Sequence, residues 1–195
     1  MSLTTLAKVK SQLDIPASDT SQDVRLTTYL NAASSAIESY CERKFEQATY
    51  TEYHHGRRMN FIMPREFPIV SVTTLNIDND RLYPSDKDVP VNEYSIADRN
   101  RTIFYSGKFP QGFNNIKLVY TAGYATIPGD VELACIWACE WFVKHRERKD
   151  MGRVSVSKGD ESVGILASMP PMILELINPY KRCEPPDINN PIENR

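Results

Sequence analysis

The sequence lacks any apolar run that approaches the roughly 18 residues needed to cross a bilayer. Its first residues, Met1-Ser2-Leu3-Thr4-Thr5, have neither the basic nor the apolar region of a signal peptide. It also lacks a strong net charge, because 23 Lys and Arg oppose 25 Asp and Glu. A protein that wraps nucleic acid over its whole surface should be clearly basic, so the charge balance argues against this class but not against a local basic patch. We expect no membrane contact and synthesis in a cytosol-like compartment.

Catalytic and metal-binding patterns are missing as well. There is no Gly-x-Ser-x-Gly elbow, no Gly-Lys-Ser/Thr phosphate loop and no paired-glycine dinucleotide turn. His54 and His55 have no further ligands at a zinc-binding spacing. Asp78-Asn79-Asp80 lacks the glycine and the closing glutamate of a calcium loop, and is better explained as a turn. We therefore predict that the chain is not an enzyme and holds no metal or cofactor.

The four cysteines are predicted to be reduced and mostly buried. A chain of 195 residues with 41% hydrophobic residues can form a core without disulfides. Cys135 and Cys139 lie one helical turn apart among apolar residues, which favours core packing over metal binding.

The first section of the chain has a helical pattern. Thr4 and Thr5 can cap a short helix that Pro16 stops. A longer helix follows, with Arg43 and Lys44 expected in its last turn, where the helix dipole favours cations. Its single apolar stripe contains Leu26, Leu30, Ala33, Ile37 and Tyr40.

The middle section changes to the alternation of β-strands, clearest over Ile116–Thr121. Ser71–Ile77 is followed by the turn at Asp78–Asp80 and by Arg81–Tyr83, which predicts a hairpin. No βαβ unit is visible, which argues against a doubly wound fold. We predict an α+β fold with a small antiparallel sheet between two helical sections.

A third section begins at Pro128 with a helix whose residues 133–143 carry one charge in eleven. A helix that is apolar on nearly every side must be covered nearly all round. Either the rest of the chain encloses it or a neighbouring subunit covers part of it. A last short helix is predicted from Pro170-Pro171 to Pro179.

Directly after the apolar helix, residues 144–158 contain six cations and two acidic residues, a local charge of +4. The simplest interpretation is a solvated helix end. The alternative is a surface that faces a polyanion or an acidic partner. The cations are Lys144, Arg146, Arg148, Lys149, Arg153 and Lys158.

Taken together, the order of these motifs resembles the head–tail connector (adaptor) family of long-tailed bacteriophages and prophages, over roughly residues 3–182. The resemblance rests on Tyr40-Cys41-Glu42-Arg43-Lys44-Phe45, Pro68-Ile69-Val70-Ser71-Val72, Val119-Tyr120-Thr121-Ala122-Gly123-Tyr124 running into Ile127-Pro128, and Lys144-His145-Arg146.

The resemblance implies a non-enzymatic ring, usually of twelve subunits, under the portal protein in the virion neck. Such a ring extends the DNA channel, contacts passing DNA transiently and docks the next neck or tail-completion protein. Residues 1–47 and 128–182 would then form the helical connector core, 48–127 the antiparallel β insertion, and 183–195 a flexible tail.

Three surfaces follow from this expectation. The subunit interface would use Ile136, Trp137 and Trp141 of the apolar helix, and the basic residues between 144 and 158 would face the channel or a partner. The portal-docking residues would be Tyr180, Lys181, Arg182, Pro185, Pro186, Ile188 and Ile192.

Two alternatives stay open. The chain could be a tail-completion or other virion structural protein that uses a similar β element. It could also be a nucleic-acid-binding module that acts through the cations between 144 and 158, in which case its DNA affinity would fall steeply with salt.

Overall fold

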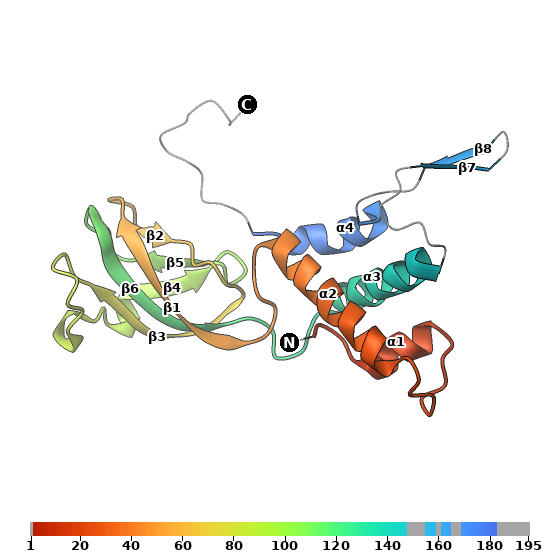
Figure 1. Cartoon of the computed structure of the whole chain (residues 1–195). Coiled ribbons are helices and arrows are strands. Elements are labelled where there is room, and N and C mark those ends of the chain that lie inside the picture. Colours follow the sequence, from red (N-terminus) through yellow and green to blue (C-terminus); the bar gives the residue numbers. More distant parts are fainter. Residues whose placement is uncertain (1, 148–154, 159–160, 165–168, 183–195) are drawn as a thin grey trace. The chain divides into compact units, whose positions relative to one another are not determined.

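The computed structural model describes residues 2–147, 155–158, 161–164 and 169–182, and it confirms the predicted α+β class (Figure 1). The chain divides into two compact units. We call Met1–Phe45 with Thr126–Lys181 the helical unit. The β unit is Glu46–Ala125, to which Arg182 is also assigned.

The helical unit is built by helices from both ends of the chain. Thr5 caps the first helix by accepting a hydrogen bond from the Lys8 backbone N–H. The helices are α1 (Leu6–Gln12), α2 (Asp23–Cys41), α3 (Gly129–Glu147) and α4 (Pro171–Ile177), followed by the 3₁₀ turn η3 (Asn178–Tyr180). The unit also contains the antiparallel pair β7 (Ser155–Lys158) and β8 (Glu161–Gly164).

Helix α2 ends at Cys41, before the two cations that its charge pattern places in the last turn. Glu42 adopts a left-handed φ of 56°, which terminates the helix after Cys41. Arg43 and Lys44 therefore lie beyond the helix, so their predicted place in its last turn is wrong. The predicted apolar stripe is buried from Leu26 to Ile37 and ends on Cys41, with Tyr40 only half-buried.

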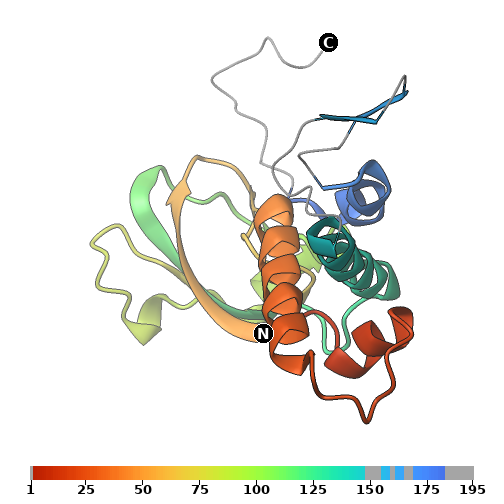
Figure 2. The same cartoon turned by 45° about the vertical axis from the view of Figure 1, so that its right-hand side comes forward.

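Helix α3 is the centre of the helical unit and packs against α1, α2 and α4 (Figure 2). The predicted core packing of the cysteines is confirmed for Cys41, Cys135 and Cys139, which are buried free thiols. Burial raises the pKa of the Cys41 thiol to about 11, so this side chain stays neutral. The buried face of α3 contains mostly small side chains, namely Val131, Ala134, Cys135, Ala138, Cys139 and Val143.

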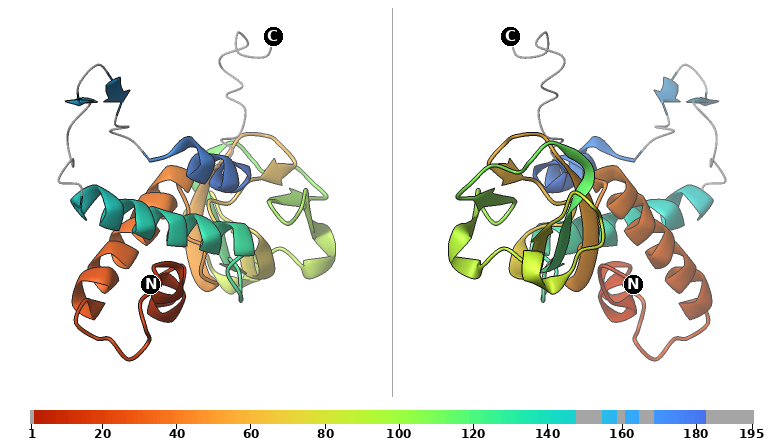
Figure 3. Two further views of the ribbon diagram at one scale, coloured as in Figure 1. Left: turned by 90° about the vertical axis from the view of Figure 1, so that its right-hand side faces the viewer. Right: turned by 90° about the vertical axis from the view of Figure 1, so that its left-hand side faces the viewer.

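The β unit consists of two three-stranded antiparallel sheets rather than one small sheet (Figures 1 and 3). One has the order β1 (Ala48–Gly56), β6 (Gly112–Ala122), β3 (Ile69–Ile77). The other has the order β2 (Phe61–Ile62), β5 (Thr102–Tyr105), β4 (Tyr94–Ala97). Both sheets contribute to one core, which contains Ile62, Ile69, Leu75, Ile103, Phe109, Ile116, Leu118, Tyr120 and Ala122.

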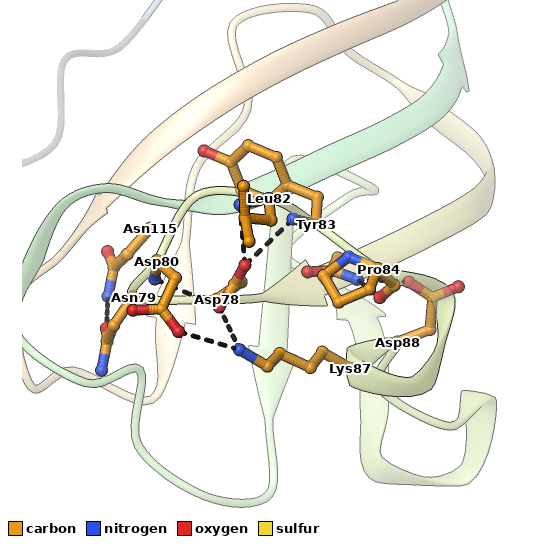
Figure 4. Close-up of polar contacts among 10 residues, drawn as sticks. Asp78, Asn79, Asp80, Leu82, Tyr83, Pro84, Lys87, Asp88 and Asn115 are labelled. Atoms are coloured by element: carbon orange, nitrogen blue, oxygen red, sulfur yellow. Dashed lines mark hydrogen bonds and ion pairs between the residues drawn. The ribbon is translucent and has the colours of Figure 1, made fainter.

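The predicted hairpin at Asp78–Asp80 is wrong, because β3 pairs with β6 and residues 81–83 form no strand. The Asp78 carboxylate accepts the backbone N–H groups of Leu82 and Tyr83 at 2.8 and 3.0 Å (Figure 4). In a hairpin, backbone N–H groups of residues 81–83 would instead donate to carbonyl groups of β3. Because the Asp78 side chain accepts the N–H groups of Leu82 and Tyr83, the segment forms a loop and not a strand.

Candidate functional site

The most conspicuous surface of the helical unit is a shallow apolar groove between α3 and α4. Trp137 and Trp141 of α3 form one wall, with Leu133 one helical turn before them. Met172 of α4 is 56% exposed at the other side. The groove has a volume of about 380 Å³ and is lined by Trp137, Glu140, Trp141, Lys144, Pro170, Met172 and Ile173.

The groove arises from the way α3 distributes its side chains. Its alanines and cysteines face α1, α2 and α4, where small residues allow close packing. The tryptophans lie at the edge of this packed face, beside α4, and are only half-buried. Trp141 packs edge-on against Phe142, with 5.2 Å between the ring centroids. Its ring also lies near that of His145, with 4.3 Å between the centroids. The described part of the chain thus leaves aromatic surface of α3 in contact with solvent.

Polar contacts border this apolar surface. Lys144 forms an ion pair with Glu140, four residues earlier on the same helix. Glu140 also accepts a hydrogen bond from the Gln12 amide at 3.1 Å. A charged rim around an aromatic centre is the usual anatomy of a protein–protein interface.

The sequence model of the head completion protein family matches residues 2–183. The chain belongs to the head completion protein family. Membership confirms the predicted resemblance and the predicted class, a structural protein of the virion that acts where head and tail meet. The family is a structural family and not a class of enzymes.

Solved structures with the same fold come from gene transfer agent particles. A chain in the neck of an empty particle, computed with C6 symmetry, has a TM-score of 0.58 at 18% identity, covering 91% of this chain and 89% of that one. A chain in the neck of a native particle, computed with C12 symmetry, has a TM-score of 0.56 at 18% identity, with coverages of 92% and 88%. A chain in the virion of a native particle has a TM-score of 0.59 at 18% identity, with coverages of 91% and 89%. No curated protein matches the sequence.

Of the predicted interface residues of this head completion protein, the structure brings Trp137 and Trp141 together in the groove. Ile136 is half-buried and does not line it. The sequence analysis missed Met172, which lines the groove from α4. No local pattern could have pointed to it, because it comes from another helix.

The basic residues between 144 and 158 are only partly described. Lys144 is paired with Glu140, and Arg146 donates a hydrogen bond to the Tyr29 hydroxyl at 3.4 Å. Lys158 lies on β7, and Arg148, Lys149 and Arg153 lie outside the described residues. The contact of this cluster with DNA or a partner stays a prediction.

The portal-docking prediction likewise reaches the described chain only at its start. Tyr180 donates a hydrogen bond to Asp130 at 2.9 Å and packs on Phe45, with 6.0 Å between ring centroids. The Lys181 ammonium lies 5.3 Å above the Tyr40 ring. Arg182 is half-buried. The remaining docking residues, Pro185, Pro186, Ile188 and Ile192, lie outside the described residues.

The histidines give no support to a metal site. His54 Nε2 lies 3.0 Å from Glu52, and His55 stacks on Phe113 with 4.6 Å between ring centroids. In the part of the chain that the structure describes, no three His, Cys, Asp or Glu side chains come together as metal ligands. Nor does any described helix combine the length and apolarity of a bilayer span.

Proposed function

We propose that this head completion protein forms a ring in the virion neck, between the portal protein and the next neck or tail-completion protein. The observation that carries the proposal is the groove of α3 and α4, where Trp137 and Trp141 remain partly in solvent. Aromatic residues in a charged rim are the usual anchors of protein interfaces. A neighbouring subunit that covers this groove would complete the burial that the apolar sequence of α3 demands.

The ring geometry is supported by the similar neck chains, one of which was computed with C12 symmetry. A contact between two different surfaces of the same chain repeats from copy to copy and closes when the rotation allows. Twelve copies is the number that we propose here. The open centre would let DNA pass without a strong net charge to hold it, consistent with the formal charge of −2.

The ends of the ring need two further surfaces. We assign portal docking to residues 180–195. At the start of this segment, Tyr180 bonds to Asp130 and Lys181 lies above the Tyr40 ring of the helical unit. The cations between Lys144 and Lys158 would face the DNA channel or an acidic ring.

Particle complementation tests the proposal. Heads made without this protein should fail to join tails, and the full chain supplied in trans should restore joined particles. Trp141→Glu places a charge in the apolar groove and should reduce joining at least roughly tenfold, as a loss of about 1.4 kcal/mol per contact would. Phe113→Glu is the matched control, because Phe113 is an exposed aromatic of the β unit.

Deletion of residues 183–195 tests the docking surface. The truncated chain should not bind portal-containing heads, although its helical unit keeps the same melting temperature. Full binding by the truncated chain would overturn the tail assignment. Normal joining by Trp141→Glu would overturn the proposed interface.

A further inference from the structure

A second exposed apolar feature lies on the other unit, in the loop of residues 78–84, which we call the Leu82 loop. Leu82 is 81% exposed. Asp80 and Arg81, immediately before it, are also exposed. An isolated exposed leucine needs no explanation. This one does, because its backbone is held in place by a dense set of hydrogen bonds.

The buried carboxylate of Asp78 holds the loop from inside (Figure 4). It accepts the backbone N–H groups of Asp80, Leu82 and Tyr83, at 3.1, 2.8 and 3.0 Å, and pairs with the Lys87 ammonium. The hydrogen bond from Lys87 and these backbone donors hold the pKa of Asp78 far below its usual range. The carboxylate is therefore charged, and the loop keeps its shape, throughout the physiological pH range.

Contacts with β6 hold the loop from outside. The Asn115 amide donates to the Asn79 side chain at 2.9 Å, and the Tyr83 hydroxyl donates to the Asn114 carbonyl. The Tyr83 ring also packs on Tyr53, with 5.3 Å between centroids. The loop is thus fixed at both ends on the β unit.

The backbone on either side of Leu82 is strained. Arg81 and Tyr83 have left-handed φ values of 62° and 53°, which residues other than glycine and asparagine rarely adopt. A backbone of this kind persists where the surrounding structure enforces it, and here the bonds from Leu82 and Tyr83 to Asp78 do so. The Asp78 network therefore presents Leu82 to solvent in a fixed position. Such preorganisation lowers the entropy lost on binding.

The exposed groups of the loop define what it can bind. Leu82 requires an apolar pocket, and its neighbours Asp80 and Arg81 require opposite charges at the rim. The groove between α3 and α4 has this arrangement, because Trp137 and Trp141 lie beside Glu140 and Lys144. Arg81 is opposite in charge to Glu140, and Asp80 is opposite in charge to Lys144. In the single chain Glu140 and Lys144 pair with each other and Asp80 lies 3.5 Å from Lys87, so the contact exchanges these partners for those of a second copy.

We infer that Leu82 of one copy inserts into the α3–α4 groove of a second copy, with Arg81 facing Glu140 and Asp80 facing Lys144. The inference rests on the proposed function, because it names the partner surface of the groove in the ring. The two surfaces differ and lie on different units, so the contact is heterologous and can repeat around a closed ring.

Photo-crosslinking in assembled particles tests the contact directly. Leu82 is replaced with p-benzoylphenylalanine, the particles are irradiated, and cross-linked peptides are identified by mass spectrometry. The expected product joins two copies of the chain, from position 82 to the segment that contains Trp137 and Trp141. The matched control carries the probe at Val24, which is 85% exposed on the helical unit and should give no such product. A product with another virion protein, or within one copy, would overturn the inference.

A charge-reversal cycle tests the orientation. Arg81→Glu and Glu140→Arg should each reduce particle joining roughly tenfold, which corresponds to about 1.4 kcal/mol. The double variant should recover joining to within roughly threefold of the wild type, because the pair is restored with its signs exchanged. Folding damage by either change would give no such recovery. Additive losses in the double variant would overturn the pairing.

Failure of the inference is distinguishable from failure of the proposed function. If a probe at Trp141 cross-links to a second copy outside residues 78–84, the Leu82 contact is refuted and the proposed ring still stands. If the probe cross-links to no second copy in assembled particles, both the Leu82 contact and the proposed ring interface are refuted.

Discussion

The central helix of the helical unit and the core of the β unit bury different kinds of side chain. In the helical unit, the central helix α3 turns its alanines and cysteines inward and leaves Trp137 and Trp141 half in solvent. In the β unit, the core holds large residues, among them Phe109, Leu118 and Tyr120. The difference shows that residue size alone does not decide burial. Close helix packing selects small residues, so the largest side chains of α3 remain available for a partner.

Hydrogen bonds also satisfy polar groups inside the β unit. Glu52 is half-buried and accepts hydrogen bonds from the Tyr120 hydroxyl and from the Arg65 backbone N–H at 3.1 Å. The Tyr120 hydroxyl in turn accepts the Glu66 backbone N–H at 3.0 Å. This network joins β1 and β6 to the segment before β3. The β unit is therefore held by directional bonds as well as by its apolar core.

The largest expected effect comes from removing volume in the β unit. Leu118→Ala should lower its free energy of unfolding by about 3 kcal/mol, because Leu118 is fully buried between the sheets. Hydrogen exchange of the β6 amides measures the change. Val119→Ala, one residue along on the opposite, half-buried face, should lose less than about 1 kcal/mol. Equal losses would contradict the account of a single core.

The helical unit should suffer from added volume instead. Ala138→Leu inserts a larger side chain into the packed face of α3 and should destabilise the unit by about 2 kcal/mol. Tryptophan fluorescence during urea unfolding reports this unit selectively, because both tryptophans of the chain, Trp137 and Trp141, lie on α3. Ala32→Leu, the same change at an exposed position of α2, should shift the free energy of unfolding by under about 0.5 kcal/mol.

The smallest expected effect depends on pH. Burial by itself would raise the pKa of Glu52, but hydrogen bonds from His54, Tyr120 and the Arg65 backbone outweigh it and lower this pKa. Because the pKa of Glu52 is lower in the folded than in the unfolded state, its ionised form stabilises the folded protein. This stabilisation is fully present at pH values above the unfolded pKa, about 4.3 for glutamate. That contribution is lost as the pH falls through the folded value.

Glu52→Gln should therefore lower the free energy of unfolding by about 1 kcal/mol at pH 7, and this deficit should shrink on acidification. Urea unfolding at pH 7 and pH 3 measures the difference. Glu46→Gln, an exposed carboxylate of the same unit, should change stability by under about 0.5 kcal/mol at either pH. A deficit that grows at low pH would contradict the sign of the shift.

The candidate site was only partly predictable. The apolar run of α3 indicated an incompletely covered helix, and it identified Trp137 and Trp141. It did not separate them from Ile136, because the sequence does not say which face packs on α1, α2 and α4. Leu82 carried no signal at all, since its exposure depends on a carboxylate four residues earlier in the chain.

The sequence by itself determined the helices, the α+β class and the alternation of β6, because these follow from the local periodicity of apolar residues and from capping residues such as Thr5. The tertiary structure alone decided that β3 pairs with β6, that Asp78 holds the loop after it, and which side of α3 stays in solvent. These outcomes depend on competition between distant groups for the same hydrogen-bond donors and the same packing space. Local sequence patterns do not indicate the outcome of that competition.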